Sequence, residues 1–215
     1  HKLFPPYKAQ RPPMPEELRG QIALIEELVE SFSAPLVKLE GYEADDVIGT
    51  ITKHAPSNVH CYVITTDRDA LQLVSDTVTV VTPNSRANKV FNPELVKHEM
   101  GVTPELVPDL KALMGDSSDN IPGIPLVGPK TAVRWLDKYG TLDAIIENAH
   151  HLPGKAGRNL AEHTEEALLY RHLATIERNV PTYCCWESGR LAFDERELRA
   201  TLESLGIRAS IPQVG

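Results

Sequence analysis

The order of hydrophobic and polar positions predicts an α/β region at the front of the chain. Apolar side chains recur at helical spacing through residues 16–33, and Pro15 is well placed to start that helix. Short apolar runs predict strands at residues 35–39, 60–65 and 76–82, with helical patterns between them at 44–55 and 68–74. This alternation is typical of a largely parallel sheet flanked by helices.

Beyond about Pro104 the pattern changes to helices alone. Helical periodicity covers residues 104–115, 128–140, 141–149, 155–174 and 195–206. The strongest interruption is the proline- and glycine-rich stretch "DNIPGIPLVGPK" at 119–130. The sequence therefore predicts an α/β core followed by a smaller helical unit.

Composition narrows the class of protein. The 215 residues are 41% hydrophobic and 24% charged, and no apolar run approaches the roughly 20 residues that span a bilayer. We expect a globular cytoplasmic protein without a membrane partner. Cys61 lies in an apolar run and Cys184 and Cys185 are neighbours, a set that predicts reduced thiols rather than disulfides or a cysteine metal site. The net charge of −8 excludes a uniformly basic surface for nucleic acid.

The candidate chemistry lies in three groups of carboxylates. One group stands where a loop enters a helix, one follows an apolar run and one lies in "MGDSSDNIPG": Glu43, Asp45 and Asp46; Asp67 and Asp69; Asp116 and Asp119. Taken singly, each group is explained by helix capping or turn formation. Together they favour a site, because ligands of open α/β sheets bind at the carboxyl ends of the strands.

If the seven carboxylates converge, they need counter-charge, because like charges at contact distance raise one another's pKa. All the donors are oxygens, which suits Mg²⁺ or Mn²⁺ better than zinc. Two such ions about 3.5–4 Å apart are the usual means of hydrolysing a phosphodiester. Phosphoryl transfer is the reaction class that the residues indicate.

Five motifs then carry a resemblance to a known family. "YKAQR", "GYEADDVIGT", "TTDRDALQLVSD", "LMGDSSDNIPGI" and "VGPKTA" occur in the order and approximate spacing of the bacterial 5′ nuclease family, the flap-endonuclease-like domain at the front of DNA polymerase I. The resemblance implies a PIN-like α/β core, a helical arch and a helix-three-turn-helix element that grips duplex DNA. It also implies Mg²⁺- or Mn²⁺-dependent 5′-3′ exonuclease and 5′ flap endonuclease activity in replication and repair. By this resemblance, residues 1–107 correspond to a nuclease core, residues 108–180 to a helix-three-turn-helix region and residues 181–215 to a C-terminal return segment.

The resemblance assigns roles to residues by position. Ligands of the catalytic metal cluster correspond to Glu43, Asp45, Asp46 and Asp67, with Asp69, Asp116 and Asp119 on the side of the second metal. Tyr7 and Lys8 resemble the pair at the base of the arch, where the lysine neutralises charge at the scissile phosphate and the tyrosine packs against a nucleobase. Arg11 is a candidate phosphate contact.

A second element, "GIPLVGPKTA", predicts a backbone contact to duplex DNA. A glycine hairpin that leads into a helix offers N–H groups to a phosphate, and Lys130 adds charge beside Thr131. Gly123 and Gly128 are retained, whereas Leu126 stands where the family usually has a first hairpin glycine. The resemblance also implies a K⁺ ion held by carbonyl groups of this hairpin.

The resemblance also predicts more chain upstream. In the family a first strand ends in a metal-binding Asp and a second Asp precedes the arch, and both would lie before His1. We therefore expect a fragment of a longer chain, with a polymerase module as a further candidate partner. Two alternatives stay open: a PIN-type ribonuclease or acid-rich phosphatase, and a DNA-structure-binding fragment without turnover.

Overall fold

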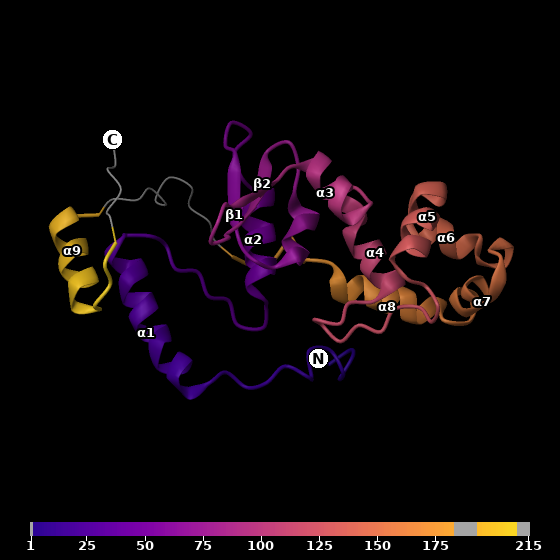
Figure 1. Cartoon of the computed structure of the whole chain (residues 1–215), viewed down its shortest axis with the longest axis horizontal. Coiled ribbons are helices and arrows are strands. Elements are labelled where there is room, and N and C mark those ends of the chain that lie inside the picture. The colour runs from indigo at the N-terminus through magenta and orange to yellow at the C-terminus, as the bar shows by residue number, and fades with distance from the viewer. Residues whose placement is uncertain (1, 183–192, 210–215) are drawn as a thin grey trace. The chain divides into compact units, whose positions relative to one another are not determined.

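The structure is a computed structural model that describes residues 2–182 and 193–209 (Figure 1). Its contacts separate into two compact units. Unit 1 comprises His1–Arg11 and Tyr42–Val180, and unit 2 comprises Pro12–Gly41 and Pro181–Gly215. Within the described ranges, no helix has the length and apolar character needed to cross a membrane.

Unit 1 contains a three-stranded mixed sheet, which confirms the α/β class. The strands are β1 (Cys61–Ile64), β2 (Val78–Thr82) and β3 (Lys89–Phe91), in that order across the sheet. β1 and β2 are parallel, with Cys61 opposite Val78, as the alternation of strand and helix patterns predicted. β3 pairs antiparallel to β2 and was not predicted, because a run of three residues is too short to show a period.

The strand predicted at residues 35–39 is wrong. These residues lie in unit 2 and form no strand, and Leu36 and Val37 are 46% and 40% exposed. An apolar run of this length forms a strand only where a partner ladder is available, so local pattern alone could not decide it.

Unit 1 also contains helical elements before, between and after its strands. The elements are α2 (Ala44–Lys53), the 3₁₀ helix η1 (Arg68–Leu73) and α3 (Pro93–Met100). Residues 68–74, predicted as a helix, form the tighter 3₁₀ turn. α3 was not predicted, although Asn92 caps it by accepting from the Leu95 N–H and Pro93 begins it.

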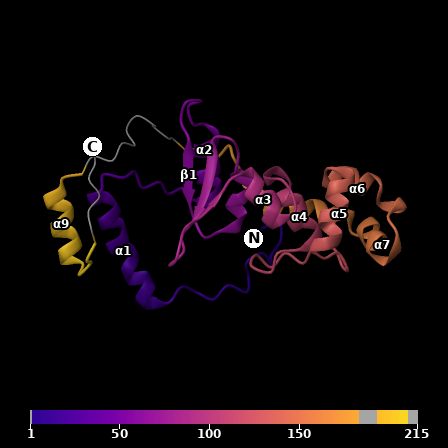
Figure 2. The same ribbon diagram turned by 45° about the horizontal axis from the view of Figure 1, so that its top comes forward.

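The remainder of unit 1 is helical, as predicted. It contains η2 (Pro104–Leu106), α4 (Val107–Met114), α5 (Pro129–Tyr139), α6 (Leu142–Glu147), η3 (Ala149–His151), α7 (Gly154–Glu162) and α8 (Thr164–Ala174). Both ribbon views show α5, α6 and α7 grouped together on the far side of α4 from the strands (Figures 1 and 2). Their shared core is fully buried and apolar, and includes Leu110, Leu113, Leu136, Leu142 and Leu160.

The single helix predicted at 155–174 is instead two helices. The backbone leaves helical geometry at His163, with φ −121° and ψ 37°. Thr164 Oγ1 donates to the Leu160 carbonyl, and a ring nitrogen of His163 lies 2.9 Å from the Asn159 carbonyl. Side chains that bond to the backbone locally compete with helix propagation, which the apolar periodicity does not reveal.

Unit 2 pairs the two predicted amphipathic helices α1 (Glu16–Ser31) and α9 (Glu195–Ser204). The rings of Phe32 and Phe193 meet edge to face, with centroids 5.5 Å apart. Cys61 is buried in β1, in agreement with its apolar surroundings, whereas Cys184 and Cys185 fall outside the described residues.

Candidate active site

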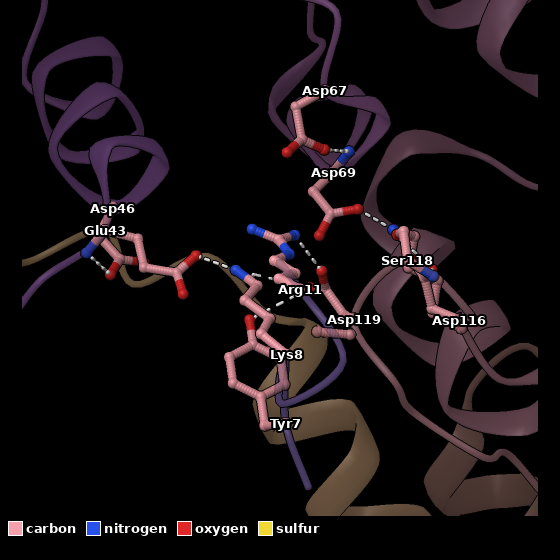
Figure 3. A network of polar contacts seen from close by, with 12 residues as sticks. Tyr7, Lys8, Arg11, Glu43, Asp46, Asp67, Asp69, Asp116, Ser118 and Asp119 are labelled. Atoms are coloured by element: carbon pink, nitrogen blue, oxygen red, sulfur yellow. Dashed lines mark hydrogen bonds and ion pairs between the residues drawn. The ribbon is translucent and has the colours of Figure 1, made fainter. Parts of the chain in front are cut away.

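A cleft of about 520 Å³ lies in unit 1 and is lined by charged side chains together with apolar groups such as Met100 and Met114. We call it the acidic cleft; its charged lining residues are Arg11, Asp67, Arg68, Asp69, Lys111 and Asp116. Figure 3 shows side chains from the N-terminal segment, from the end of β1 and from the loop after α4 pointing toward one another. The predicted groups of carboxylates are therefore brought into one neighbourhood, although they come from separate segments.

The end of β1 positions the first pair. Asp67 caps η1, because its Oδ1 accepts from the Asp69 N–H at 2.9 Å. The Asp67 N–H donates in turn to Thr65 Oγ1. This tight turn places both carboxylates at the carboxyl end of a parallel strand, where sequence analysis expected them.

At the start of α2, the capping role and the proposed ligand role overlap. The Glu43 N–H donates to Asp46 Oδ2 at 3.1 Å, which is half of a capping box. Asp46 Oδ1 accepts from the Glu177 N–H at 2.9 Å. Both oxygens of Asp46 therefore bond to the backbone and fix the start of α2 in unit 1.

Lys111 in α4 is a residue that sequence reasoning missed. It is 5% exposed, donates to Asp116 Oδ2 at 2.5 Å and forms an ion pair with Asp69. Burial acts to raise the pKa of Asp116, but the hydrogen bonds from Lys111 and Ser118 outweigh it and lower that pKa. The available signal was a lysine inside an apolar helix stripe, since a buried ammonium requires an acid partner.

Asp119 is the most deeply buried of the predicted ligands, at 3% exposure. Arg11 pairs with its Oδ1 at 2.6 Å and the Tyr7 hydroxyl donates to its Oδ2 at 3.2 Å. Lys8 lies 3.7 Å from the same carboxylate and also forms an ion pair with Glu43. The N-terminal segment thus supplies two cations to carboxylates from distant parts of unit 1.

Tyr7 lies inside this network and not on its surface. Its side chain is buried, and the Lys8 ammonium lies 4.7 Å from the ring centroid. Burial raises the pKa of Tyr7 to about 12, so the phenol stays protonated and can donate to Asp119. Lys8 has a positive φ of 55°, and its N–H donates to the Asp119 carbonyl at 3.0 Å. Such strain at a charged residue is common at functional sites.

Asp45 differs from the other carboxylates. Within the described residues it has no hydrogen-bonding or ion-pair partner, although it is only half exposed. Burial, followed by the charges of Asp67 and Glu43, raises its pKa. Lys8 acts in the opposite direction but already pairs with Glu43, so the negative charge around Asp45 is only partly balanced.

The seven predicted ligands do not form one compact cage. Among the residues that the structure describes, no three His, Cys, Asp or Glu side chains form a group able to hold a metal ion. Lys111 pairs with Asp69 and Asp116, Arg11 pairs with Asp119, and Lys8 pairs with Glu43 and lies near Asp119, while Asp45 stays in electrostatic reach of Asp67 and Glu43. The ligand set stays a prediction.

The second predicted element forms a hairpin, defined here as residues 123–128, that leads into α5. The structure gives Gly123 a packing role: it is buried with φ 70°, and a Cβ there would lie 2.2 Å from the Gly115 nitrogen. Gly128 and Lys130 are exposed and Thr131 is half exposed, and the Thr131 N–H donates to the Gly128 carbonyl. The exposed first turn of α5 is thus the part of the element open to a phosphate.

An acidic cleft at the carboxyl end of parallel strands, with lysine and arginine beside it, is characteristic of enzymes of phosphoryl transfer. Comparison with known proteins defines the class further. The family model described as "5′-3′ exonuclease, N-terminal resolvase-like domain" matches residues 1–101, and "5′-3′ exonuclease, C-terminal SAM fold" matches residues 102–197. The chain belongs to the 5′-3′ exonuclease family.

Similar proteins agree with this family. The chain is 41% identical to DNA polymerase I of Mycobacterium bovis over 181 residues, covering 83% of the chain and 20% of the relative. It is 37% identical to DNA polymerase I of Bacillus caldotenax, covering 100% of the chain and 25% of the relative. The chain thus spans a quarter or less of the length of these two relatives.

A solved structure confirms the predicted fold class. The flap endonuclease of bacteriophage T5, in a pseudo-enzyme–product complex with DNA and metal ions, is 25% identical, with a TM-score of 0.67. The match covers 94% of this chain and 78% of the phage protein. The α/β core with its helical subdomain therefore has the fold of a known flap nuclease.

Proposed function

We propose that this chain is a metal-dependent 5′ nuclease that hydrolyses phosphodiester bonds of branched or 5′-flapped duplex DNA. We assign the reaction to residues 1–107 together with Asp116 and Asp119, duplex binding to the rest of residues 108–180, and the exit toward a polymerase module to residues 181–215. The family, the DNA polymerase I relatives and the phage flap endonuclease support this function. We propose a bacterial cytoplasmic location on the nucleoid.

The observation that carries the proposal is the uneven charge balance of the acidic cleft. Arg11 and Lys111 pair with carboxylates that line or adjoin the cleft, and Lys8 pairs with Glu43, while Asp45 beside the cleft has no ion-pair partner in the described residues and a raised pKa near Asp67 and Glu43. A half-buried carboxylate next to further negative charge is favourable only when a cation balances it.

The donor set fits divalent ions with oxygen ligands. Glu43, Asp45 and Asp67 are the candidate ligands of one Mg²⁺ or Mn²⁺ ion, with Asp46 orienting the start of α2. Asp69, Asp116 and Asp119 are the candidate ligands of a second ion. When bound, such ions lower the pKa of water and stabilise the leaving oxygen.

The chain's own residues position and neutralise the scissile phosphate. Lys8 lies between Glu43 and Asp119, where its ammonium can turn to a phosphate oxygen of the substrate. Tyr7 acts through Asp119 in this arrangement, because its hydroxyl donates to that carboxylate and its ring is buried. Arg11 lines the cleft and offers a second phosphate contact.

The hairpin and α5 hold the duplex away from the cleft. The open backbone at Gly128, the ammonium of Lys130 and Thr131 would contact phosphates, which carry no base information. Leu126 keeps the positive φ, 68°, that a glycine would take. Carbonyl groups of the hairpin would hold the implied K⁺ ion, because such donors are backbone atoms whatever the side chain at Leu126.

The direct test is cleavage of a 5′-flapped DNA in Mg²⁺ or Mn²⁺, with binding measured in Ca²⁺ on the same protein. We expect cleavage near the junction of single and double strands. Preferential cleavage of single-stranded RNA would favour the PIN-type ribonuclease instead. Tight flap binding without cleavage in any divalent ion would favour the DNA-structure-binding alternative.

Metal binding has a readout independent of turnover. A ligand that binds only the folded state raises its melting temperature by mass action, so millimolar Mg²⁺ or Mn²⁺ should stabilise the protein. The Asp45→Asn variant should shift less, because it removes a candidate ligand. No shift with either ion would contradict the metal-dependent mechanism.

A further inference from the structure

The tip of the hairpin is a tight turn with an unusual residue in it. The Val127 N–H donates to the Ile124 carbonyl at 3.0 Å, which closes a four-residue turn with Pro125 in second place. Leu126 occupies the third place with φ 68°. Proline followed by a positive φ is the pattern of a type II turn, whose third position favours glycine or asparagine. A leucine there is strained.

Little packing against the described part of the chain offsets this strain at Leu126. The flanking residues Ile124 and Val127 are 3% and 5% exposed, whereas Leu126 is 69% exposed. The turn is held from both sides, because the Ile124 N–H donates to Leu113 O and Asn159 Nδ2 donates to Pro125 O at 2.7 Å. An apolar side chain thus projects from a rigid base without packing against the protein.

Two residues later, Gly128 is a glycine at a position where the fold does not require one. Its φ is −96°, which any residue adopts, and a Cβ built there would meet no atom within 4 Å. Neither conformation nor internal packing requires glycine at this position. The hairpin therefore has leucine where the turn favours glycine, and glycine where the fold accepts any side chain. An external partner that contacts Leu126 and closely approaches Gly128 would explain both residues.

We propose that Leu126 is a duplex-contact residue, whose methyl groups pack against deoxyribose beside the phosphate that approaches Gly128 and Lys130. This inference rests on the proposed function. The faces of the sugars are the apolar surfaces that lie between phosphates, and they are alike in every sequence. Burying an apolar side chain against them adds affinity without base recognition and without release of a counterion.

The test compares two substitutions of Leu126 by their affinity for flapped DNA in Ca²⁺ over a range of salt concentrations. Leu126→Asn suits the left-handed backbone but removes the apolar contact, and should weaken binding about three- to tenfold. The slope of log affinity against log salt should not change. Leu126→Met keeps an apolar side chain and should bind within about twofold of the original protein. Thermal melting should show Leu126→Asn to be no less stable.

Lys130→Ala is the matched control, because it removes charge from the same element and should reduce the magnitude of the salt slope. If Leu126→Asn binds as tightly as the original protein while Lys130→Ala reduces the slope, the Leu126 inference fails and the proposed duplex binding stands. If Leu126→Asn also reduces the slope, it disturbs the phosphate contact itself, and the apolar contact is again overturned. If the original protein does not bind duplex DNA, the proposed function fails.

Discussion

The acidic cleft and the hairpin are both suited to phosphate, but they are built in different ways. The cleft joins residues that are far apart in the chain, such as Arg11, Asp67 and Asp116. The hairpin and the first turn of α5 are contiguous in the sequence, and their exposed groups lie within residues 123–131. The cleft depends on charged side chains in balance, whereas the hairpin depends on backbone shape and one nearby ammonium.

This difference predicts which substitutions should have large effects and which should have small ones. Removing one charge from the cleft disturbs every neighbouring carboxylate, because the groups are partly buried and interact strongly. Removing one side chain from the hairpin leaves the backbone contacts in place. Substitutions in the cleft should therefore alter chemistry or folding strongly, and those in the hairpin should alter affinity modestly.

The largest effect is expected for Asp67→Asn. Cleavage of flapped DNA should fall by about a thousandfold, because one negative charge is lost from a candidate metal site. Binding should change by less than about threefold, since the phosphate meets less repulsion. Single-turnover cleavage in Mg²⁺ and affinity in Ca²⁺ measure the two quantities. Asp76→Asn, an exposed change of the same kind, is the control. Equal losses of cleavage and affinity would remove Asp67 from the chemical step.

The next effect concerns Lys111→Met. Without the ammonium, Asp69 and Asp116 keep their charges in a poorly solvated site, so the free energy of unfolding should fall by about 3 kcal/mol in EDTA. Mg²⁺ or Mn²⁺ should recover part of that loss, because a divalent ion can replace the missing cation. Urea denaturation with and without the ions measures both. Lys97→Met, an exposed change on α3, should cost far less. Full stability of Lys111→Met in EDTA would show that the pairing contributes nothing.

A smaller effect is expected at Asp109. Asp109 in α4 is 7% exposed and its Oδ2 accepts from the Leu142 N–H at 2.8 Å, which ties α4 to the start of α6. Asp109→Ala should cost about 2 kcal/mol, because that buried N–H loses its acceptor. Asp109→Asn retains an acceptor and should cost less. If both variants are equally unstable, the hydrogen bond is not what matters at this site.

The same residue predicts a pH dependence. Burial raises the pKa of Asp109 above its ordinary value of 3.8, despite its contacts with Leu142 and Arg171. Its contribution to stability is therefore fully present below the ordinary pKa and is lost as pH rises through the raised one. The stability of the original protein relative to Asp109→Asn should fall over that interval in urea denaturation. A constant difference would contradict the raised pKa.

The smallest effect is expected for Lys130→Ala. It should weaken binding about two- to threefold for every duplex sequence, and it should reduce the magnitude of the salt slope by about one unit. Affinity measured on several unrelated duplexes tests this, with Lys97→Ala as the control for a lost surface charge. An effect that varies with sequence would mean that Lys130 contacts a base, and the contrast with the cleft would then need another explanation.

The sequence by itself determined the features that depend on neighbouring residues. Helical spacing predicted α1, α5 and α9, and alternating apolar runs predicted β1 and β2. The order of the acidic motifs carried the family resemblance, which the matches to residues 1–101 and 102–197 confirm. These signals are readable because periodicity and motif spacing are local properties of the chain.

Only the tertiary structure decided which of those local possibilities are used. Residues 35–39 have a strand pattern but no paired ladder, and Asp46 uses both oxygens on backbone N–H groups. In the sequence, Lys111 is a single charge in a helical pattern. Only the fold shows that it is buried and paired with Asp69 and Asp116. Ladder pairing, burial and ion pairing depend on groups that the chain brings together from far away, so no local window of sequence contains them.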